Sequence, residues 1–326
     1  MQANAELKSW IGDFERQHAM LERLDAFDER WKKHPIHRAF VERLDSLDGR
    51  EEILEAALDF MRRFARSPEL IAGLIAEAGN DPYFRPPFYS LKSDLYNGLL
   101  LLEHEQLSIV LSVIGVDELA AKKSSDREQV TIPFIGSDNA YHFLKAGGAT
   151  LSIWEAPPVG ADFSVGQSSR CRLREQRRME DGDTLVIDGR SESFSIDHAT
   201  SDIVYLHAAL LKDAAPVTVE YDHETLRYVS ASATHEVSSR LQLMATLLRV
   251  ADRQDAAPAF AELTEKGDFF TRWHVMREFL ALDAEAALPC LRRMADSDPH
   301  PEVRETARRT LEMIEAGETE DEKCPA

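Results

Sequence analysis

The sequence predicts a multidomain α+β protein in which a helical domain, an antiparallel β-sandwich or small barrel and a second helical domain follow one another. Three observations support this fold class. Apolar residues recur at helical spacing within residues 1–122, short β-rich runs separated by turn residues occupy residues 130–232, and a repeating helical pattern covers residues 235–317. A chain of 326 residues is also long enough for two or three compact units. We expect the acidic tail, residues 318–326, to be disordered.

The composition is that of an acidic globular protein. Hydrophobic residues make up 44% of the chain, charged residues make up 29%, and the formal net charge is −20. Because basic residues are not in excess, bulk association with nucleic acid or an anionic membrane is not expected. Cys171, Cys290 and Cys324 lie far apart, so neither a disulfide framework nor a zinc site is indicated. With no signal-peptide pattern and no apolar run that could span a bilayer, we expect a cytoplasmic protein.

The N-terminal region is expected to begin with a long amphipathic helix, because its apolar residues recur at steps of three and four. These residues are Leu7, Trp10, Ile11, Phe14, Leu21, Leu24 and Trp31. Pro35 ends the pattern, and further helices are expected over 53–64 and from Ser67 to Gly79. The apolar run 99–114 fits either a buried helix or a pair of strands.

A segment rich in proline and aromatic residues, NDPYFRPPFYSLKSDLYNG, interrupts the helical periodicity over residues 80–98. Aromatic residues and arginine dominate binding hot spots, so one interpretation is a lid or a site for a protein partner. The equal alternative is a long loop held to the helices by its own rings. The residues concerned are Tyr83, Phe84, Arg85, Phe88 and Tyr89.

The central region contains nine β-rich runs, each bounded by Gly, Pro, Asp or Ser, which is typical of an antiparallel sandwich or small barrel. In order they are VTIPFI, AYHFLKA, ATLSIWEA, CRLREQRRM, TLVIDG, FSIDH, DIVYLHAALL, PVTVEYD and LRYVSA. No catalytic motif with a serine nucleophile, no phosphate-binding loop and no dinucleotide fingerprint occurs in the chain, so no catalytic residue is predicted.

The stretch LREQRRMEDGDTLVIDG, residues 173–189, resembles the second motif of the cupins, a family of small β-barrels that often hold a metal. A strand with alternating sides is followed by a Gly-Asp turn and an apolar strand that ends at Gly189. The family's metal-ligating histidine would stand about three residues further on, where this chain has residues 190–193, Arg-Ser-Glu-Ser. The first motif would place a His-x-His pair near GGATLSIWEAPP, which contains no histidine. The resemblance therefore implies a cupin-like scaffold without the family's metal ligands.

The run CRLREQRRM places arginines on one face of a strand, where they could hold a carboxylate or phosphate in a bidentate manner. The alternative is a solvated outer face balanced by acidic residues. We expect a small anionic ligand in the mouth of the β-domain. The candidate ligand-binding residues are Arg172, Arg174, His198, His207 and Trp154.

A metal site with non-standard ligands is the alternative hypothesis for the same domain. His142, His198 and His207 would converge with a carboxylate from Asp197 or Glu155 to hold Fe, Mn or Zn. The simpler interpretation is that each histidine is an ordinary residue of a β-strand, and no cofactor is then expected.

The C-terminal region repeats itself, because SSRLQLMATLL, FTRWHVMREFL and EVRETARRTLEMI align with Arg240, Arg272 and Arg304 each 32 residues apart. The apolar positions also align, with Leu243, Val275 and Ala307 in one set and Leu247, Phe279 and Leu311 in another. DPHPEVRETARRTL resembles a HEAT repeat, over about residues 234–317. That resemblance implies an α-solenoid that binds proteins, with the three arginines bonding within or between repeats; an arginine ladder for an acidic partner is the alternative.

Together these features predict a non-enzymatic cytosolic binding or accessory protein that holds a small anionic ligand or a peptide and contacts a protein through the solenoid. The alternative is a metal-dependent oxygenase or isomerase of the cupin type. A third possibility is that the solenoid forms a homodimer.

Overall fold

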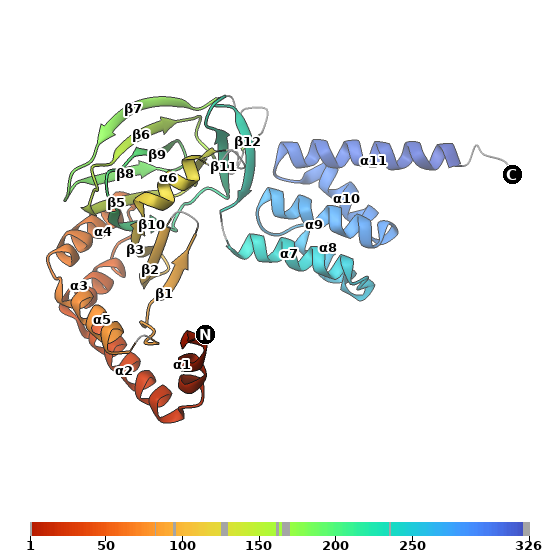
Figure 1. The fold of residues 1–326 in the computed structure, drawn as a ribbon. Helices are drawn as coiled ribbons and strands as arrows, with labels where there is room; N and C mark the ends of the chain where they lie inside the picture. The colour runs from red at the N-terminus through yellow and green to blue at the C-terminus, as the bar shows by residue number, and fades with distance from the viewer. Residues whose placement is uncertain are drawn as a thin grey trace.

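The computed structural model describes residues 2–81, 83–93, 96–124, 130–160, 163–164, 170–234 and 236–321. Figure 1 shows helices at the N-terminal end (red and orange) beneath a group of antiparallel sheets, and a second group of helices (blue) beside strand β12. The chain is therefore a mixed α and β protein with helical regions at both ends, as the sequence predicts.

Five helices form the N-terminal region. They are α1 (Gln2–Ile11), α2 (Phe14–Lys33), α3 (Pro35–Leu44), α4 (Arg50–Ala65) and α5 (Glu69–Asn80). The long helix expected at the start is divided at Gly12, because Asp13 caps α2 by accepting a hydrogen bond from the backbone N–H of Arg16 at 2.9 Å. Pro35 occupies the first turn of α3, where its missing N–H has no helical partner.

The ambiguous run 99–114 is a pair of strands. Strands β1 (Tyr89–Lys92), β2 (Tyr96–Glu103) and β3 (Leu107–Ile114) lie at one edge of a six-stranded sheet and are followed by helix α6 (Val116–Ser124). The apolar run lacks strict alternation because both faces of this sheet are covered. The strands of the β-region thus begin before residue 130.

Each of the nine β-rich runs contains one strand. They are β4 (Thr131–Phe134), β5 (Asp138–Lys145), β6 (Thr150–Glu155), β7 (Arg172–Arg178), β8 (Thr184–Asp188), β9 (Glu192–His198), β10 (Ile203–Leu210), β11 (Val217–Asp222) and β12 (Tyr228–Ala233). The strand order is β1-β2-β3-β10-β5-β8 in the large sheet, β12-β11-β4 in a second sheet and β7-β6-β9 in a third. Neighbouring strands in all three sheets are antiparallel.

Two hydrophobic cores lie on opposite faces of the six-stranded sheet. On one face, Phe60 of α4 and other helical residues pack against Ile109 and Leu206. On the other face, Phe143 packs with Leu151 of the three-stranded sheet β7-β6-β9. The sheet therefore separates the N-terminal helices from the interior of the β-region, and residue parity along each strand decides which side a side chain faces.

The C-terminal helices have a core of their own. They are α7 (Glu236–Val250), a short 3₁₀ turn (Gln254–Ala256), α8 (Ala257–Leu263), α9 (Phe269–Leu282), α10 (Ala284–Ser297) and α11 (Pro301–Asp321). Val275, Phe279 and Ala307 are buried, as their aligned positions predict. Their counterparts on α7 are not, because Leu243 is 70% exposed and Leu247 is 63% exposed. As the first helix of the region, α7 has no earlier repeat among the described residues to cover that face.

Two of the three repeated arginines, Arg272 and Arg304, bond inside this helical region. Arg272 donates two hydrogen bonds to Asp298, at 2.9 and 2.7 Å, and Arg304 donates to the carbonyl oxygens of Asp298 and Pro299. These contacts favour the structural role of the arginines over the ladder for an acidic partner.

Two further predictions concern the end of the chain and its relation to membranes. Helix α11 continues to Asp321, so residues 318–321 are helical where the sequence predicted disorder, and 322–326 lie outside the described residues. Within the described part of the chain, no helix combines the length and apolar character needed to cross a bilayer.

Candidate functional site

A cavity of about 440 Å³ lies inside the β-region, between the large sheet, β4, β9 and α6. Its lining comprises Tyr96, Ile114, Leu119, Val130, Thr131, Pro133, Tyr141, Phe143, Phe194, Ser195, Ile196, Tyr205 and Glu220. We call it the tyrosine cavity. Its size and its mostly apolar walls are those of a small-molecule site.

Strand register explains why the aromatic side chains meet there. β10 pairs with β5 so that Tyr205 lies opposite Phe143 and His207 lies opposite Tyr141. Alternate residues of a strand share a face, so all four side chains are on the inner side of the sheet. The ring of Tyr141 lies 5.0 Å from that of Phe194 and 5.9 Å from that of Tyr205, between centroids. The packed rings give the cavity fixed walls.

The phenol groups of Tyr141 and Tyr205 are neutral at physiological pH. Burial raises the pKa of Tyr205 to about 12, against a smaller opposing effect of its hydrogen bond with Ser112. Burial also raises the pKa of Tyr141 far above its usual range. Both phenols therefore remain protonated and can donate or accept a hydrogen bond, but they are poor proton acceptors for catalysis.

The only ionisable carboxyl group among the described lining residues is that of Glu220, which accepts a hydrogen bond from Ser230 at 3.1 Å. The lining includes no lysine, arginine or histidine from the described part of the chain. An anion would find no cation there, so the cavity suits an uncharged molecule.

His207 lies beside the cavity and supports its wall. Its ring stacks on Tyr141, with 4.5 Å between centroids and 2° between planes, and its Nε2 lies 2.7 Å from Oδ1 of Asn139. Asn139 donates from Nδ2 to the carbonyl oxygen of Ser137 at 2.6 Å, so its Oδ1 faces the histidine as an acceptor. Burial lowers the pKa of His207 to about 4, and the ring is neutral at physiological pH.

The three histidines of the alternative metal site do not come together. His142 lies opposite Leu206 whereas His207 lies opposite Tyr141, so the two imidazoles are on opposite faces of the sheet. His142 faces α4, and burial followed by the charge of Arg62 lowers its pKa. His198 is exposed at the end of β9. Among the described residues, no three His, Cys, Asp or Glu side chains form a group that could hold a metal ion.

The predicted anion site is likewise divided. Arg172 on β7 is 79% exposed and pairs with Glu155, while Arg174 pairs with Glu192, so cross-strand carboxylates neutralise both guanidinium groups on the outer surface. This is the solvated, balanced face that the sequence left as an alternative. Trp154 is buried and donates from Nε1 to Oγ of Ser195 at 3.0 Å. The five residues predicted to bind an anionic ligand thus do not share one site.

Arg190, the first residue after Gly189, forms an ion pair with Asp188. Arg190 contacts both carboxylate oxygens of Asp188, at 2.8 and 3.0 Å, and Arg50 of α4 bridges Asp188 and the buried Asp138. The cluster ties α4 to the ends of β5 and β8. Its charges are internally balanced.

The aromatic segment is largely pinned to the N-terminal helices. Phe84 and Phe88 are buried, and Phe88 lies edge-on to Trp31 at 5.6 Å between centroids. Tyr83 packs on Trp10 at 5.1 Å. Burial removes Phe84 and Phe88 from the predicted partner site, so Arg85 and Tyr89 are its exposed members.

Sequence reasoning missed the tyrosines of the cavity. Tyr141 and Phe143 alternate within AYHFLKA, and Ile203 and Tyr205 alternate within DIVYLHAALL, which is a usable signal of an aromatic face. The sequence does not reveal which face points inward, because helices cover the other side of the same sheet.

Three solved structures illustrate what the chain is similar to. Ectoine synthase from P. lautus has 11% sequence identity and a TM-score of 0.23, covering 37% of this chain and 67% of that chain. A sugar phosphate isomerase from a cupin superfamily, from Silicibacter pomeroyi, has 10% sequence identity and a TM-score of 0.24. The match covers 43% of this chain and 77% of that chain. A cupin domain from Bordetella pertussis has 9% identity and a TM-score of 0.22, covering 37% and 97%.

Each of these likenesses covers less than half of this chain and says nothing of its chemistry. Neither a protein-family model nor a curated protein matches the sequence.

Proposed function

We propose that this protein is a non-enzymatic binding or accessory protein whose β-region is a cupin-like barrel that holds a small uncharged ligand in the tyrosine cavity. The observation that supports this most is the lining of the cavity, where aromatic and aliphatic walls surround a few hydroxyl groups. A cavity with such walls binds the apolar part of a ligand by removing it from water, and its hydroxyl groups orient the ligand with one or two hydrogen bonds.

The proposed ligand class differs from the anionic ligand that the sequence favoured. Arg172 and Arg174 are engaged with Glu155 and Glu192 on the outside of the β-region. The phenols of Tyr141 and Tyr205 are neutral because burial raises their pKa values. We therefore expect a compact aromatic or aliphatic compound with a hydroxyl or carbonyl group.

Calorimetric titration with 4-ethylphenol tests this proposal, because the probe combines an apolar ring with one hydroxyl group. The Ile196→Phe variant fills part of the cavity and should weaken binding by about tenfold or more. The matched control is Val186→Phe, since Val186 is 44% exposed on the outside of the same β-region. Absence of saturable binding, or equal affinity of the Ile196→Phe protein, would refute the proposal.

The separation of the three histidines predicts a low metal content. An oxygenase or isomerase built on His142, His198 and His207 needs all three around one ion, which strand register opposes. We expect protein purified without chelator to contain much less than one equivalent of iron, manganese or zinc. Elemental analysis measures this directly, and a full equivalent lost in the His198→Ala and His207→Ala variants would contradict the prediction.

A further inference from the structure

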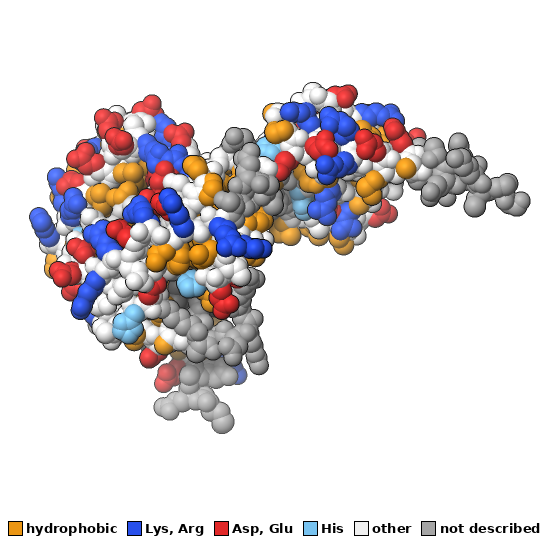
Figure 2. Space-filling view, turned by 90° about the horizontal axis from the view of Figure 1, so that it is seen from above, with side chains coloured by type: hydrophobic (Ala, Val, Ile, Leu, Met, Phe, Trp, Pro, Cys, Tyr) orange, Lys and Arg blue, Asp and Glu red, His pale blue; other side chains and the backbone are white. Residues whose placement is uncertain are grey.

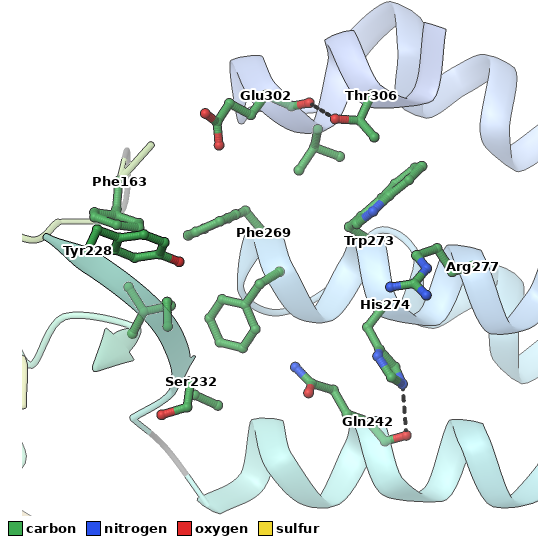
Figure 3. A pocket seen from close by; sticks show the side chains of 15 residues that line it. Phe163, Tyr228, Ser232, Gln242, Phe269, Trp273, His274, Arg277, Glu302 and Thr306 are labelled. Atoms are coloured by element: carbon green, nitrogen blue, oxygen red, sulfur yellow. Dashed lines mark hydrogen bonds between the residues drawn. The ribbon is translucent and has the colours of Figure 1, made fainter. Parts of the chain in front are cut away.

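A second pocket, of about 340 Å³, lies where strand β12 meets the C-terminal helices, and we call it the junction pocket (Figure 3). One wall comes from Phe163, Tyr228 and Ser232 of the β-region. The opposite walls come from α7, α9 and α11. The tyrosine cavity and the junction pocket share no lining residue.

The aromatic walls of the junction pocket are held in place. Phe269 lies edge-on to Phe270 at 5.4 Å between centroids, and it stacks on the buried ring of His300 at 4.1 Å. Phe163 packs on Tyr228 at 6.2 Å. An apolar ligand would therefore meet walls that are already ordered.

The polar groups of the junction pocket are mostly engaged. His274 lies 3.0 Å from Oγ1 of Thr246 and 3.2 Å from the carbonyl oxygen of Gln242. Glu302 accepts a hydrogen bond from Ser164. Figure 3 shows the Glu302 carboxylate beside Phe163 and Tyr228, away from Arg277 on the other side of the pocket.

Arg277 is the exception. It follows Trp273 by one helical turn, so the two side chains share a face of α9 and both line the pocket. Arg272 on the same helix is paired with Asp298, whereas Arg277 forms no ion pair or hydrogen bond with any described residue. In a protein with 58 acidic and 38 basic residues, a guanidinium group without a carboxylate partner beside an aromatic pocket is available for an anionic ligand.

We infer that the junction pocket binds an apolar ligand that carries a carboxylate. The ring or alkyl body lies against Phe269, Phe270 and Trp273, and the carboxylate accepts hydrogen bonds from Arg277. Arginine suits this group because its planar fork matches the two oxygens of a carboxylate.

The test compares 4-phenylbutyrate with the uncharged 4-phenylbutanamide, which has the same body, in calorimetric titrations of the full chain. The acid should bind about tenfold more tightly than the amide, and Arg277→Gln should remove that preference. Because Arg277 is exposed and unpaired among the described residues, the variant should fold normally. Arg292→Gln on α10 is the matched control, since Arg292 is exposed and does not line the pocket.

Two further variants locate the bound acid. Trp273→Phe should abolish any change in tryptophan fluorescence on binding, while Ile196→Phe in the tyrosine cavity should leave the affinity for 4-phenylbutyrate unchanged. Equal affinities for acid and amide, or an Arg277→Gln protein that keeps the preference, would overturn the inference. So would loss of binding in the Ile196→Phe protein alone, because the acid would then occupy the tyrosine cavity.

Discussion

At the scale of single residues, His207 links the stability of the β-region to pH. The ring stacks on Tyr141 and bonds to Asn139, and burial lowers its pKa from 6.5 to about 4. As the pH falls, the unfolded chain binds this proton near pH 6.5, whereas the native protein stays unprotonated until about pH 4. The contribution of neutral His207 to the free energy of unfolding is therefore complete above about pH 6.5. It is lost as the pH falls from that value to about pH 4.

We predict that the free energy of unfolding falls more steeply in the native sequence than in a His207→Gln variant when the pH is lowered from about 7.5 to about 5. The difference should be about 2 kcal/mol. Glutamine is the control of choice because its amide can still donate to Asn139. Urea unfolding at the two pH values measures the effect, and parallel losses in both proteins would show that His207 does not cause it.

The ion pair of Arg272 and Asp298 is buried, because the two side chains are 9% and 3% exposed. The Arg272→Met substitution should lower the free energy of unfolding by about 3 to 5 kcal/mol, because it leaves the buried carboxylate of Asp298 without its partner. Arg292→Met, at an exposed position, should change stability by less than about 0.5 kcal/mol. Denaturant unfolding compares them. If adding Asp298→Asn to Arg272→Met restores no stability, the unpaired charge is not the cause of the loss.

At the scale of elements, the sequence predicts strands best where one face meets solvent or where turn residues separate short runs. All nine runs between 130 and 232 contain a strand for this reason. The run 99–114 remained ambiguous because β2 and β3 are covered on both faces and lack strict alternation. Leu243 and Leu247 of α7 are exposed although they align with buried residues of later helices, because the alignment does not show which helix face is covered.

The turn after β8 gives an element-scale prediction. A Cβ added at Gly189 would lie 2.3 Å from the backbone oxygen of Ser137. The Gly189→Ala substitution should therefore lower the free energy of unfolding by about 1 to 3 kcal/mol. Gly79→Ala is the matched control, because nothing lies within 4 Å of a Cβ at that helical position. The control should be neutral or stabilising by up to about 1 kcal/mol. Thermal unfolding of both variants measures this, and similar melting temperatures would contradict the close approach.

At the scale of the whole molecule, the formal net charge is −20, yet the face drawn in Figure 2 carries charges of both signs. Figure 2 shows basic and acidic side chains interspersed over the visible surface of both the β-region and the C-terminal helices. Many of these charges are paired across strands or along helices, as Arg172 is with Glu155. Such pairing favours a solvated, charge-balanced face for the arginine-rich strand β7.

The candidate sites were less predictable than the fold, because each depends on which strands and helices become neighbours. Tyr141 and Tyr205 meet through the pairing of β5 with β10, and Trp273 and Tyr228 line one pocket because the C-terminal helices lie beside β12. The spacing of residues along a strand shows which side chains share a face of the sheet. It does not show the order of the strands or which face of the sheet the helices cover. The sequence shows that residues 190–193 contain no histidine, but it does not show that Tyr141 and Tyr205 line a cavity.

A crystal structure of the protein soaked with 4-bromophenol would test directly whether the tyrosine cavity binds a small uncharged ligand. Anomalous scattering from bromine locates the probe without reference to its shape. We predict a bromine peak inside the cavity, with the phenol ring among Tyr96, Tyr141 and Tyr205 and no peak there in the Ile196→Phe protein. If crystals of the native sequence show bromine bound elsewhere and none in the tyrosine cavity, the proposed binding site is contradicted.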